Sequence, residues 1–306
     1  MKEDSGVTDF SDFENSRPLW RWGASARIGV IGGMGEMGSL FSRFFQERGF
    51  TVAVSDRNTE LDNLELVEAA DVVLFAVPLH LTVDVIRSLL PYFRSDQLIV
   101  DLCSLKVAPI REMMRSRASV VGLHPMFGGR VSAFHGQTLV ACPVRIDPVD
   151  WAHLRGLFTG AGIRVKETSA EHHDRMMSII QVLFHMTTML TGRVLRELGV
   201  DIAETLEYTS PSYRLEINTI GRMFAQNGAL YSAITQLNPS TGEILHHLME
   251  GLQCFEKWYR DGDLKAFMDD FQLSAEHLGG FCREAYKESS AILDFTVKLA
   301  NRNDRS

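Results

Sequence analysis

The sequence lacks the residue patterns that mark disulfide-rich, zinc-binding and other metal-dependent proteins. Its four cysteines are far apart and include no C-x-x-C pair: Cys103, Cys142, Cys254 and Cys282. Such spacing favours buried free thiols in a reducing compartment over disulfides or a zinc site. No two histidines have the H-x-x-x-H spacing of a metal pair on a helix, and we expect no bound metal.

Long apolar runs and an excess of basic charge are missing as well. No run approaches the roughly 18 apolar residues of a membrane span, and the acidic N-terminal residues lack the apolar core of a signal peptide. The net charge of -8 argues against a nucleic-acid partner. We therefore expect a cytoplasmic protein that binds neither membranes nor nucleic acids.

The chain has 306 residues, enough for two modest domains with real cores. Residues 1–25 form an acidic N-terminal arm. Residues 26–166 alternate strand and helix patterns, and these βαβ units predict an α/β domain with a doubly wound parallel sheet of the Rossmann type. Residues 167–306 show only helical patterns, which predict an all-helical second domain.

The periodic patterns also place the individual elements. Strands are expected at residues 28–31, 50–55, 71–78, 97–101, 118–123, 137–142 and 163–165. Helices of the second domain are expected at residues 171–198, 201–208, 212–227, 229–236, 240–261 and 263–300. Within the first of these helices, residues 178–190 are apolar on nearly every side. A helix of this kind is buried, and we interpret it as part of a subunit interface in a homodimer.

A glycine-rich turn near the start of the first domain predicts a dinucleotide site. The stretch from Arg27 to Gly38 reads RIGVIGGMGEMG, which is a strand, a tight turn and a helix start with G-x-G-x-x-G spacing. In such a turn the first glycine permits the sharp bend, the second lets the backbone approach a diphosphate, and the third lets helix and strand pack closely. The cofactor-binding candidates in the turn are Gly33, Met34, Gly35, Glu36, Met37 and Gly38. The alternative is a glycine-rich loop that binds nothing.

An acidic residue at the end of the second strand supports this interpretation. Asp56 lies about 20 residues beyond the turn, where an acid commonly binds the ribose hydroxyls of NAD. Arg57 could help to hold a 2′-phosphate, but the carboxylate of Asp56 would repel that group. We therefore favour NAD over NADP as the cofactor.

The ends of the other strands supply candidates for catalysis. In an open α/β sheet, ligands bind outside the carboxyl ends of the strands. Val77 and Pro78 end one strand and are further cofactor candidates, while Ser104, Lys106 and His124 follow the next two strands and should converge near the nicotinamide. His124 is the candidate general base because imidazole titrates near neutral pH. The alternative is a histidine that merely caps a loop.

Two features of the helical domain are candidates for substrate binding. His185 interrupts the apolar helix, with Gln181 and Thr188 on its face; the alternative is a core histidine with satisfied hydrogen bonds. The helix at residues 212–227 carries polar residues four apart: Arg214, Asn218, Arg222 and Gln226. Arginines suit carboxylate recognition, although ion pairs with Glu204, Glu207 or Glu216 would explain them equally well.

Several motifs in order along the chain resemble a known family. They are GGMGEMG, Ala76-Val-Pro, DLCSLK at 101–106, GLHPMFG at 122–128, Glu171-His172, SPSYRLE at 210–216 and GRMFAQ at 221–226. Over residues 26–300 the sequence resembles prephenate dehydrogenases of the TyrA family. The likeness is greatest to the dehydrogenase half of enteric bifunctional chorismate mutase–prephenate dehydrogenases. We expect no mutase domain in the 26 residues before the glycine turn.

The resemblance implies NAD(P)-dependent oxidative decarboxylation of prephenate to 4-hydroxyphenylpyruvate, a step of tyrosine biosynthesis. It implies that His124 accepts the proton of the substrate hydroxyl and that Ser104 orients His124 or this hydroxyl. It also implies that Arg222 binds the ring carboxylate, with His185, Gln226 and Tyr231 near the substrate. By the same likeness Arg214 positions its helix, and Lys106 lies near the cofactor or His124.

Two departures from the enteric pattern leave the substrate open. After Gly128 the chain reads GRVSAFH, which places Arg130 and His135 where enteric members have a Pro-Asp-Ser-Gly type of loop. Phe184 stands where those relatives carry arginine. Arogenate and 4-amino-4-deoxyprephenate are therefore alternative cyclohexadienyl substrates. A cofactor-binding regulator without activity is a third hypothesis, but it would need a missing base or a missing glycine turn.

Overall fold

The computed structural model describes residues 21–23 and 25–303, and the side chains up to residue 298. Most of the predicted acidic arm lies outside these residues. The chain divides into two compact units, Met1–Met176 and Met177–Ser306, which we describe one at a time. This division falls about one helix length beyond the change of pattern at residue 166, since the start of the first long helix belongs to the nucleotide-binding unit.

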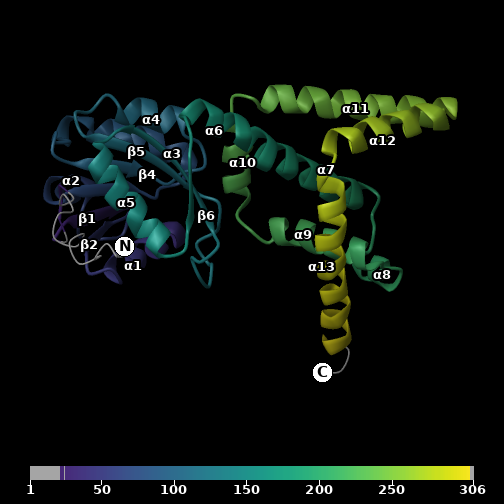
Figure 1. Ribbon diagram of the computed structural model, residues 1–306, viewed down its shortest axis with the longest axis horizontal. Helices are drawn as coiled ribbons and strands as arrows, with labels where there is room; N and C mark the ends of the chain where they lie inside the picture. Colours follow the sequence, from purple (N-terminus) through teal and green to yellow (C-terminus); the bar gives the residue numbers. More distant parts are fainter. Residues whose placement is uncertain (1–20, 24, 304–306) are drawn as a thin grey trace, which may run out of the picture. The chain divides into compact units, whose positions relative to one another are not determined.

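A seven-stranded sheet, in the order β2-β1-β3-β4-β5-β6-β7, forms the first unit (Figure 1). The strands are β1 (Arg27–Ile31), β2 (Thr51–Ser55), β3 (Val72–Phe75), β4 (Leu98–Asp101), β5 (Ser119–Pro125), β6 (Thr138–Arg145) and β7 (Arg164–Glu167). Every neighbouring pair is parallel except β5 and β6. The chain between those two contains no helix, so β6 returns antiparallel, and the prediction of parallel strands is wrong for this pair.

Helices cover both faces of the sheet, which confirms the doubly wound α/β prediction. They are α1 (Glu36–Gln46), α2 (Asn63–Ala69), α3 (Leu79–Leu89), the short 3₁₀ turn η2 (Leu90–Tyr92), α4 (Val107–Met113) and α5 (Pro148–Gly160). Phe41 and Phe44 of α1 pack with Phe158 of α5 on one face. Apolar residues of α2, α3 and α4 form the core on the other face. Successive residues of the central strands alternate between these two cores, as the strand period of two requires.

The second unit is all-helical, as predicted. One helical run consists of α6 (Ala170–Met177), the π-helical turn η3 (Ser178–Leu183) and α7 (Phe184–Glu197). It is followed by α8 (Ile202–Glu207), α9 (Pro211–Phe224), α10 (Gly228–Leu237), α11 (Thr241–Asp261), α12 (Leu264–Leu278) and α13 (Phe281–Asn303). The single helix expected at 263–300 is wrong: Gly279 has φ +56° and ends α12 before α13 begins.

Many apolar side chains of the second unit are not covered by their own chain. Ile179, Ile180 and Phe184 on the apolar helical run are about half exposed, and α11 and α12 contain no buried residue. The cysteines follow the same pattern: Cys103 and Cys142 are buried, whereas the expectation of burial is wrong for Cys254 and Cys282, which are exposed on α11 and α13. The second unit therefore presents apolar faces that a single chain leaves open.

The described part of the chain contains neither a metal-binding group of side chains nor a membrane-spanning helix. Within residues 21–23 and 25–303, no group of three or more His, Cys, Asp or Glu side chains is arranged to hold a metal ion. None of the helices among these residues combines the length and the apolar character needed to cross a membrane.

The glycine turn joins β1 to α1 with little space to spare. Gly32 has φ +80° and therefore makes the sharp bend, which the sequence analysis assigned to Gly33. A Cβ at Gly33 would overlap the side chain of Val54 on β2. A Cβ at Gly38 would lie against the carbonyl of Gly32 and 2.6 Å from the Cα of Gly33. The first turn of α1 therefore fits against the glycine turn only because position 38 has no side chain.

This contact predicts a loss of stability when Gly38 is replaced. Gly38→Ala should lower the free energy of unfolding by about 1–3 kcal/mol, the usual cost of forcing extra volume into a packed site. Gly35→Ala is the matched control, because a Cβ there would approach no atom closer than 3.4 Å. Urea denaturation of the cofactor-free protein measures both variants. Equal stability of the two variants would contradict the close packing at Gly38.

Candidate active site

The glycine turn has the donors that a dinucleotide diphosphate requires. Gly35 is the N-cap of α1 and has no side chain that could accept hydrogen bonds. The first backbone N–H groups of the helix are therefore not bound by an N-cap side chain. Asp56 at the end of β2 accepts hydrogen bonds from the backbone N–H of Met34 (3.1 Å) and of Arg57 (2.7 Å). The turn, the helix start and the acid therefore lie together, as the cofactor hypothesis needs.

The loop after β5 reaches the same turn. A Cβ at Gly129 would lie 2.6 Å from the backbone of Glu36, so the loop contacts the start of α1 through a glycine. The guanidinium Nε of Arg130 donates to a carboxylate oxygen of Glu36 at 2.7 Å. His135 instead lies against Gly162. Of the two side chains that distinguish this loop, Arg130 is thus the one beside the glycine turn.

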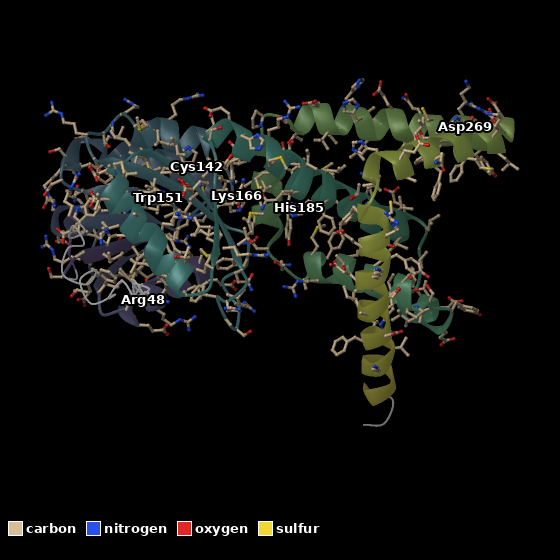
Figure 2. All side chains as sticks on the ribbon, viewed as in Figure 1. Arg48, Cys142, Trp151, Lys166, His185 and Asp269 are labelled. Carbon is tan, nitrogen blue, oxygen red and sulfur yellow. The ribbon has the colours of Figure 1, made fainter. Side chains whose placement is uncertain are left out.

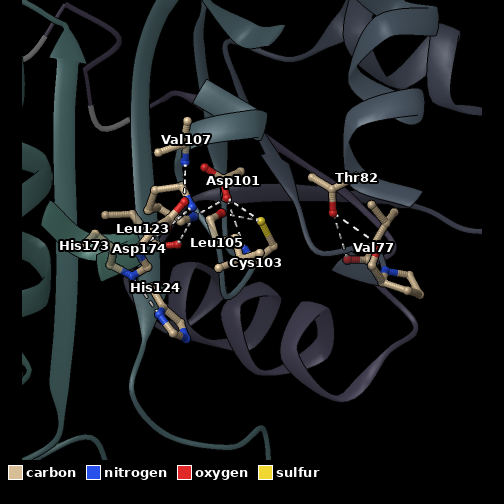
Figure 3. A network of polar contacts seen from close by, with 12 residues as sticks. Val77, Thr82, Asp101, Cys103, Leu105, Val107, Leu123, His124, His173 and Asp174 are labelled. Atoms are coloured by element: carbon tan, nitrogen blue, oxygen red, sulfur yellow. Dashed lines mark hydrogen bonds and ion pairs between the residues drawn. The ribbon is translucent and has the colours of Figure 1, made fainter. Parts of the chain in front are cut away.

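His124 lies at the carboxyl end of β5 and takes part in a chain of hydrogen bonds (Figure 3). Its Nδ1 is 2.9 Å from Nε2 of His173, and Nδ1 of His173 is 2.7 Å from Oδ1 of Asp174. His124 is 4% exposed and His173 is 1% exposed. The candidate base is therefore nearly enclosed and is bound through one of its two ring nitrogens.

Burial keeps His124 uncharged. Desolvation lowers its pKa well below the ordinary 6.5, and the neighbouring His173 and the ammonium of Lys106 lower it further. A histidine in this environment is neutral at physiological pH. That is the state in which an imidazole can accept a proton.

Lys106 lies in the interior of the first unit, where its ammonium is bound by groups of the protein. Its side chain is fully buried; its ammonium forms an ion pair with Asp101 and donates to the carbonyl of Leu123 at 2.7 Å. Burial disfavours the charged ammonium, but the carboxylate of Asp101 outweighs this effect and raises the pKa of Lys106. Lys106 therefore lies close to His124, because Leu123 directly precedes that residue; a contact of Lys106 with the cofactor stays a prediction.

Ser104 is half-buried in the loop between β4 and α4. Since His173 occupies Nδ1 of His124, Ser104 is not the partner of that nitrogen. Its contact with Nε2 of His124 or with a substrate hydroxyl stays a prediction. Val77 at the end of β3 lies beside Gly32 in the glycine turn, and Pro78 is the N-cap of α3, so both are adjacent to the expected cofactor position.

The helical unit holds a second group of predicted site residues. The ring of His185 (Figure 2) packs edge-on against the ring of Tyr231 on α10, with centroids 4.7 Å apart. Nδ1 of His185 and Oε1 of Gln181 are buried and have no hydrogen-bond partner among the described residues. Burial lowers the pKa of His185. These two polar atoms contradict the alternative of a core histidine whose hydrogen bonds are all satisfied.

The arginines of α9 are free of the ion pairs considered above. Within the described residues, no carboxylate lies within ion-pairing distance of Arg214 or Arg222. Burial raises the pKa of Tyr231, and the charge of Arg222 opposes this shift, which places the guanidinium near the Tyr231 hydroxyl. Gln226 donates to the carbonyl of Arg222 at 3.0 Å. The rings of His185 and Tyr231 are thus in contact, and the positive charge of Arg222 acts on the Tyr231 hydroxyl.

Both units match models of one protein family. Residues 41–167 match the nucleotide-binding domain of prephenate dehydrogenase, and residues 169–273 match its dimerization domain. The chain is 31% identical over 268 residues to the T-protein of Haemophilus influenzae, covering 87% of this chain and 71% of the relative. The chain belongs to the prephenate dehydrogenase family.

The names of other similar proteins differ in the substrate that they give. The chain is 29% identical over 296 residues to the "Probable arogenate/prephenate dehydrogenase" of Methanocaldococcus jannaschii, covering 90% of this chain and 66% of the relative. The crystal structure of prephenate dehydrogenase from A. aeolicus in complex with hydroxyphenyl propionate and NAD+ shares the fold, with a TM-score of 0.65 and 16% identity. That similarity covers 83% of this chain and 98% of the other.

The sequence alone did not identify His173 and Asp174 as candidate site residues of this prephenate dehydrogenase family member. In the sequence, these residues mark only the start of the long helix, as adjacent histidines beside acidic residues. They follow β7, which runs antiparallel to β5; Lys166 of β7 is in register with Val140 of β6, and Val140 with His124. Only the tertiary contact shows that His173, and not His172, is buried.

The buried pair of Lys106 and Asp101 predicts a stability effect that depends on which partner is removed. Lys106→Met leaves a buried carboxylate without its counter-charge and should lower the free energy of unfolding by about 3–5 kcal/mol. The double variant Lys106→Met/Asp101→Asn removes both charges and should regain most of this loss. Denaturant unfolding measures both variants. A double variant no more stable than the single one would contradict a stabilising role for the ion pair.

Proposed function

We propose that the chain is a dehydrogenase that oxidatively decarboxylates prephenate to 4-hydroxyphenylpyruvate, with NAD as hydride acceptor. The observation that carries the proposal is the neutral, nearly enclosed His124 at the end of β5, on the same sheet edge as the glycine turn. Membership of the prephenate dehydrogenase family supports it.

The residues of the first unit fit a dinucleotide. Gly33, Met34, Gly35, Glu36, Met37 and Gly38 would surround the diphosphate, and Asp56 would bind the ribose hydroxyls. The carboxylate of Asp56 beside the turn disfavours a 2′-phosphate, which is why we infer NAD and not NADP. Arg57 and Arg130 are the nearby cations. When bound, the nicotinamide supplies the acceptor for the hydride that leaves C4 of the substrate ring.

His124 acts on the hydroxyl at the same carbon. Its Nε2 accepts the hydroxyl proton as the hydride leaves C4, so that a carbonyl develops at that position. The carbon–carbon bond to the ring carboxylate then breaks, CO2 departs, and the bonding electrons make the ring aromatic. The proton returns from His124 to the resulting phenolate oxygen. Ser104 holds the hydroxyl or Nε2 in position during this exchange.

The helical unit supplies the substrate's carboxylate site. Arg222 carries an unpaired guanidinium that can bind a carboxylate through two hydrogen bonds. His185 and Gln226, with Tyr231, would contact the substrate beside it, and Arg214 would hold α9 in place. The buried Nδ1 of His185, which lacks a partner among the described side chains, supports this assignment because a bound polar ligand would satisfy it.

We propose further that the protein is a cytoplasmic homodimer whose ligands are small molecules. The match to a dimerization domain supports this assembly. So do the exposed apolar residues on η3, α7, α11 and α12, because a second copy could cover them.

A turnover assay tests the function. With NAD, the purified chain should convert prephenate faster than arogenate or 4-amino-4-deoxyprephenate, measured by the absorbance of NADH. His124→Asn should lower kcat by about 10²–10⁴-fold, the usual contribution of a general base, while NAD affinity measured by calorimetry stays unchanged. Preference for either other substrate would replace prephenate in the proposal. A near-normal kcat for His124→Asn would remove His124 as the base.

Replacement of Arg222 tests the carboxylate site. Arg222→Ala should raise KM for prephenate by about 10- to 150-fold, which corresponds to a charged hydrogen bond of about 1.5–3 kcal/mol. The effect on kcat should be smaller, since this contact is made in the ground state as well. Arg222→Lys should recover only part of the affinity because it loses the planar fork. Arg260→Ala on α11 is the control, and an Arg222→Ala enzyme with the KM of this control would contradict the assignment.

A further inference from the structure

We propose that Asp174 and His173 form a hydrogen-bonded relay that fixes His124 in the tautomer with a proton on Nδ1 and none on Nε2. The relay makes His173 and Asp174 positioning residues for the base, since neither needs to touch the substrate. This inference rests on the proposed function only in assigning the role of base to His124; the relay itself follows from hydrogen-bond geometry within the first unit.

The relay begins at the carboxylate of Asp174. Its Oδ1 accepts from the backbone N–H of Lys106 at 2.7 Å, and its Oδ2 accepts from the backbone N–H of Val107 at 3.0 Å. These N–H groups belong to the start of α4, which has no cap from its own N-cap side chain. A carboxylate at a helix N-terminus is also favoured by the helix dipole. Asp174 is thereby held as an acceptor with a fixed orientation.

The second step assigns the proton of His173. Oδ1 of Asp174 is 2.7 Å from Nδ1 of His173. Because the carboxylate can only accept, Nδ1 of His173 must carry the proton. In a neutral ring, Nε2 of His173 then holds a lone pair, and this nitrogen points at His124 (Figure 3).

The third step assigns the proton of His124. Its Nδ1 is 2.9 Å from the lone pair on Nε2 of His173, so Nδ1 of His124 must be the donor. Nε2 of His124 is left without a proton. Reversing both tautomers would turn the lone pair of His173 Nδ1 toward a carboxylate oxygen of Asp174. With a neutral His173, the contact with Asp174 therefore selects one tautomer for both histidines.

The groups around the relay favour a neutral His124 whose Nδ1 already has His173 as its hydrogen-bond acceptor. The ammonium of Lys106, paired with the carboxylate of Asp101, approaches His124 from β4 and the loop that follows it. His173 and Asp174 approach from α6, and the Cys142 thiol, whose pKa burial raises to about 12, belongs to β6. When Nε2 takes the substrate proton, the new imidazolium keeps its bond from Nδ1 to His173. The charge that develops is then stabilised by an acceptor that is already in place.

The tautomer can be observed directly. Long-range proton–nitrogen correlation spectra of the full chain with labelled histidines distinguish a protonated Nδ1 from a protonated Nε2. The His124 signals are identified by their loss in His124→Asn. We expect His124 at neutral pH with the proton on Nδ1. A proton on Nε2 in the wild-type protein would overturn the proposal, whatever the substrate of the enzyme is.

Kinetics of His173 variants test the consequence. His173→Leu removes the acceptor but leaves the cap of Asp174 on α4 intact, and it should lower kcat by about 10²-fold, the lower range for general-base catalysis. KM for prephenate and NAD affinity should stay within about twofold. His173→Gln can both accept from His124 and donate to Asp174, and it should retain kcat within about tenfold of wild type. His172→Leu, at the exposed neighbouring position on the same helix, should behave as wild type.

The pH profile and the fold complete the test. Wild-type kcat/KM should fall only well below pH 6.5, because the base must be neutral and its pKa is lowered. Circular dichroism and thermal unfolding establish that the variants fold. If His124→Asn is inactive but His173→Leu keeps wild-type kcat, the relay is refuted and the base assignment survives. If His124→Asn stays active, the proposed function fails, and the spectra still decide the tautomer.

Discussion

The carboxylate of Asp174 is the constraint on which the candidate active-site side of the sheet depends. With its hydrogen bonds it joins α6 to the start of α4 and orients His173. The loop that carries Ser104 and Lys106 leads into α4, and His173 contacts His124 at the end of β5. One residue thus ties together the ends of two strands and the helix that leaves the sheet. This explains why the compact first unit extends to Met176.

Much of this sheet edge was predictable because strand and helix periods are local, and parallel strands bring their carboxyl ends together. The glycine turn, Asp56 and His124 follow from these rules. The burial of Lys106 could not be predicted, because a sequence shows a lysine at a strand end but not whether Asp101 beneath it is buried. His173 was missed because only a contact across 49 residues distinguishes it from its exposed neighbour.

The helical unit shows a different limit of sequence reasoning. Helix periodicity predicted its helices, and the boundary between α12 and α13 had a local signal in the pair of glycines at 279–280. The π-helical turn η3 had none, because apolar residues on every side do not fix the helical repeat. This turn contains Gln181 and ends two residues before His185, and each of these two residues has a buried polar atom without a partner among the described residues. Such turns are often found at functional sites, and here only the structure shows one.

The two groups of candidate site residues, one on each unit, differ in how their buried polar atoms are satisfied. In the nucleotide-binding unit, His124 is satisfied at Nδ1 by His173, and the nearby charges of Lys106 and Asp101 neutralise each other. In the helical unit, Nδ1 of His185 has no partner among the described residues and Arg222 has no counter-ion there. A buried polar atom without a partner is costly, so it persists where a ligand can satisfy it. The candidate residues of the nucleotide-binding unit are thus satisfied within the chain, whereas His185 and Arg222 of the helical unit, which also carries Phe184, are not.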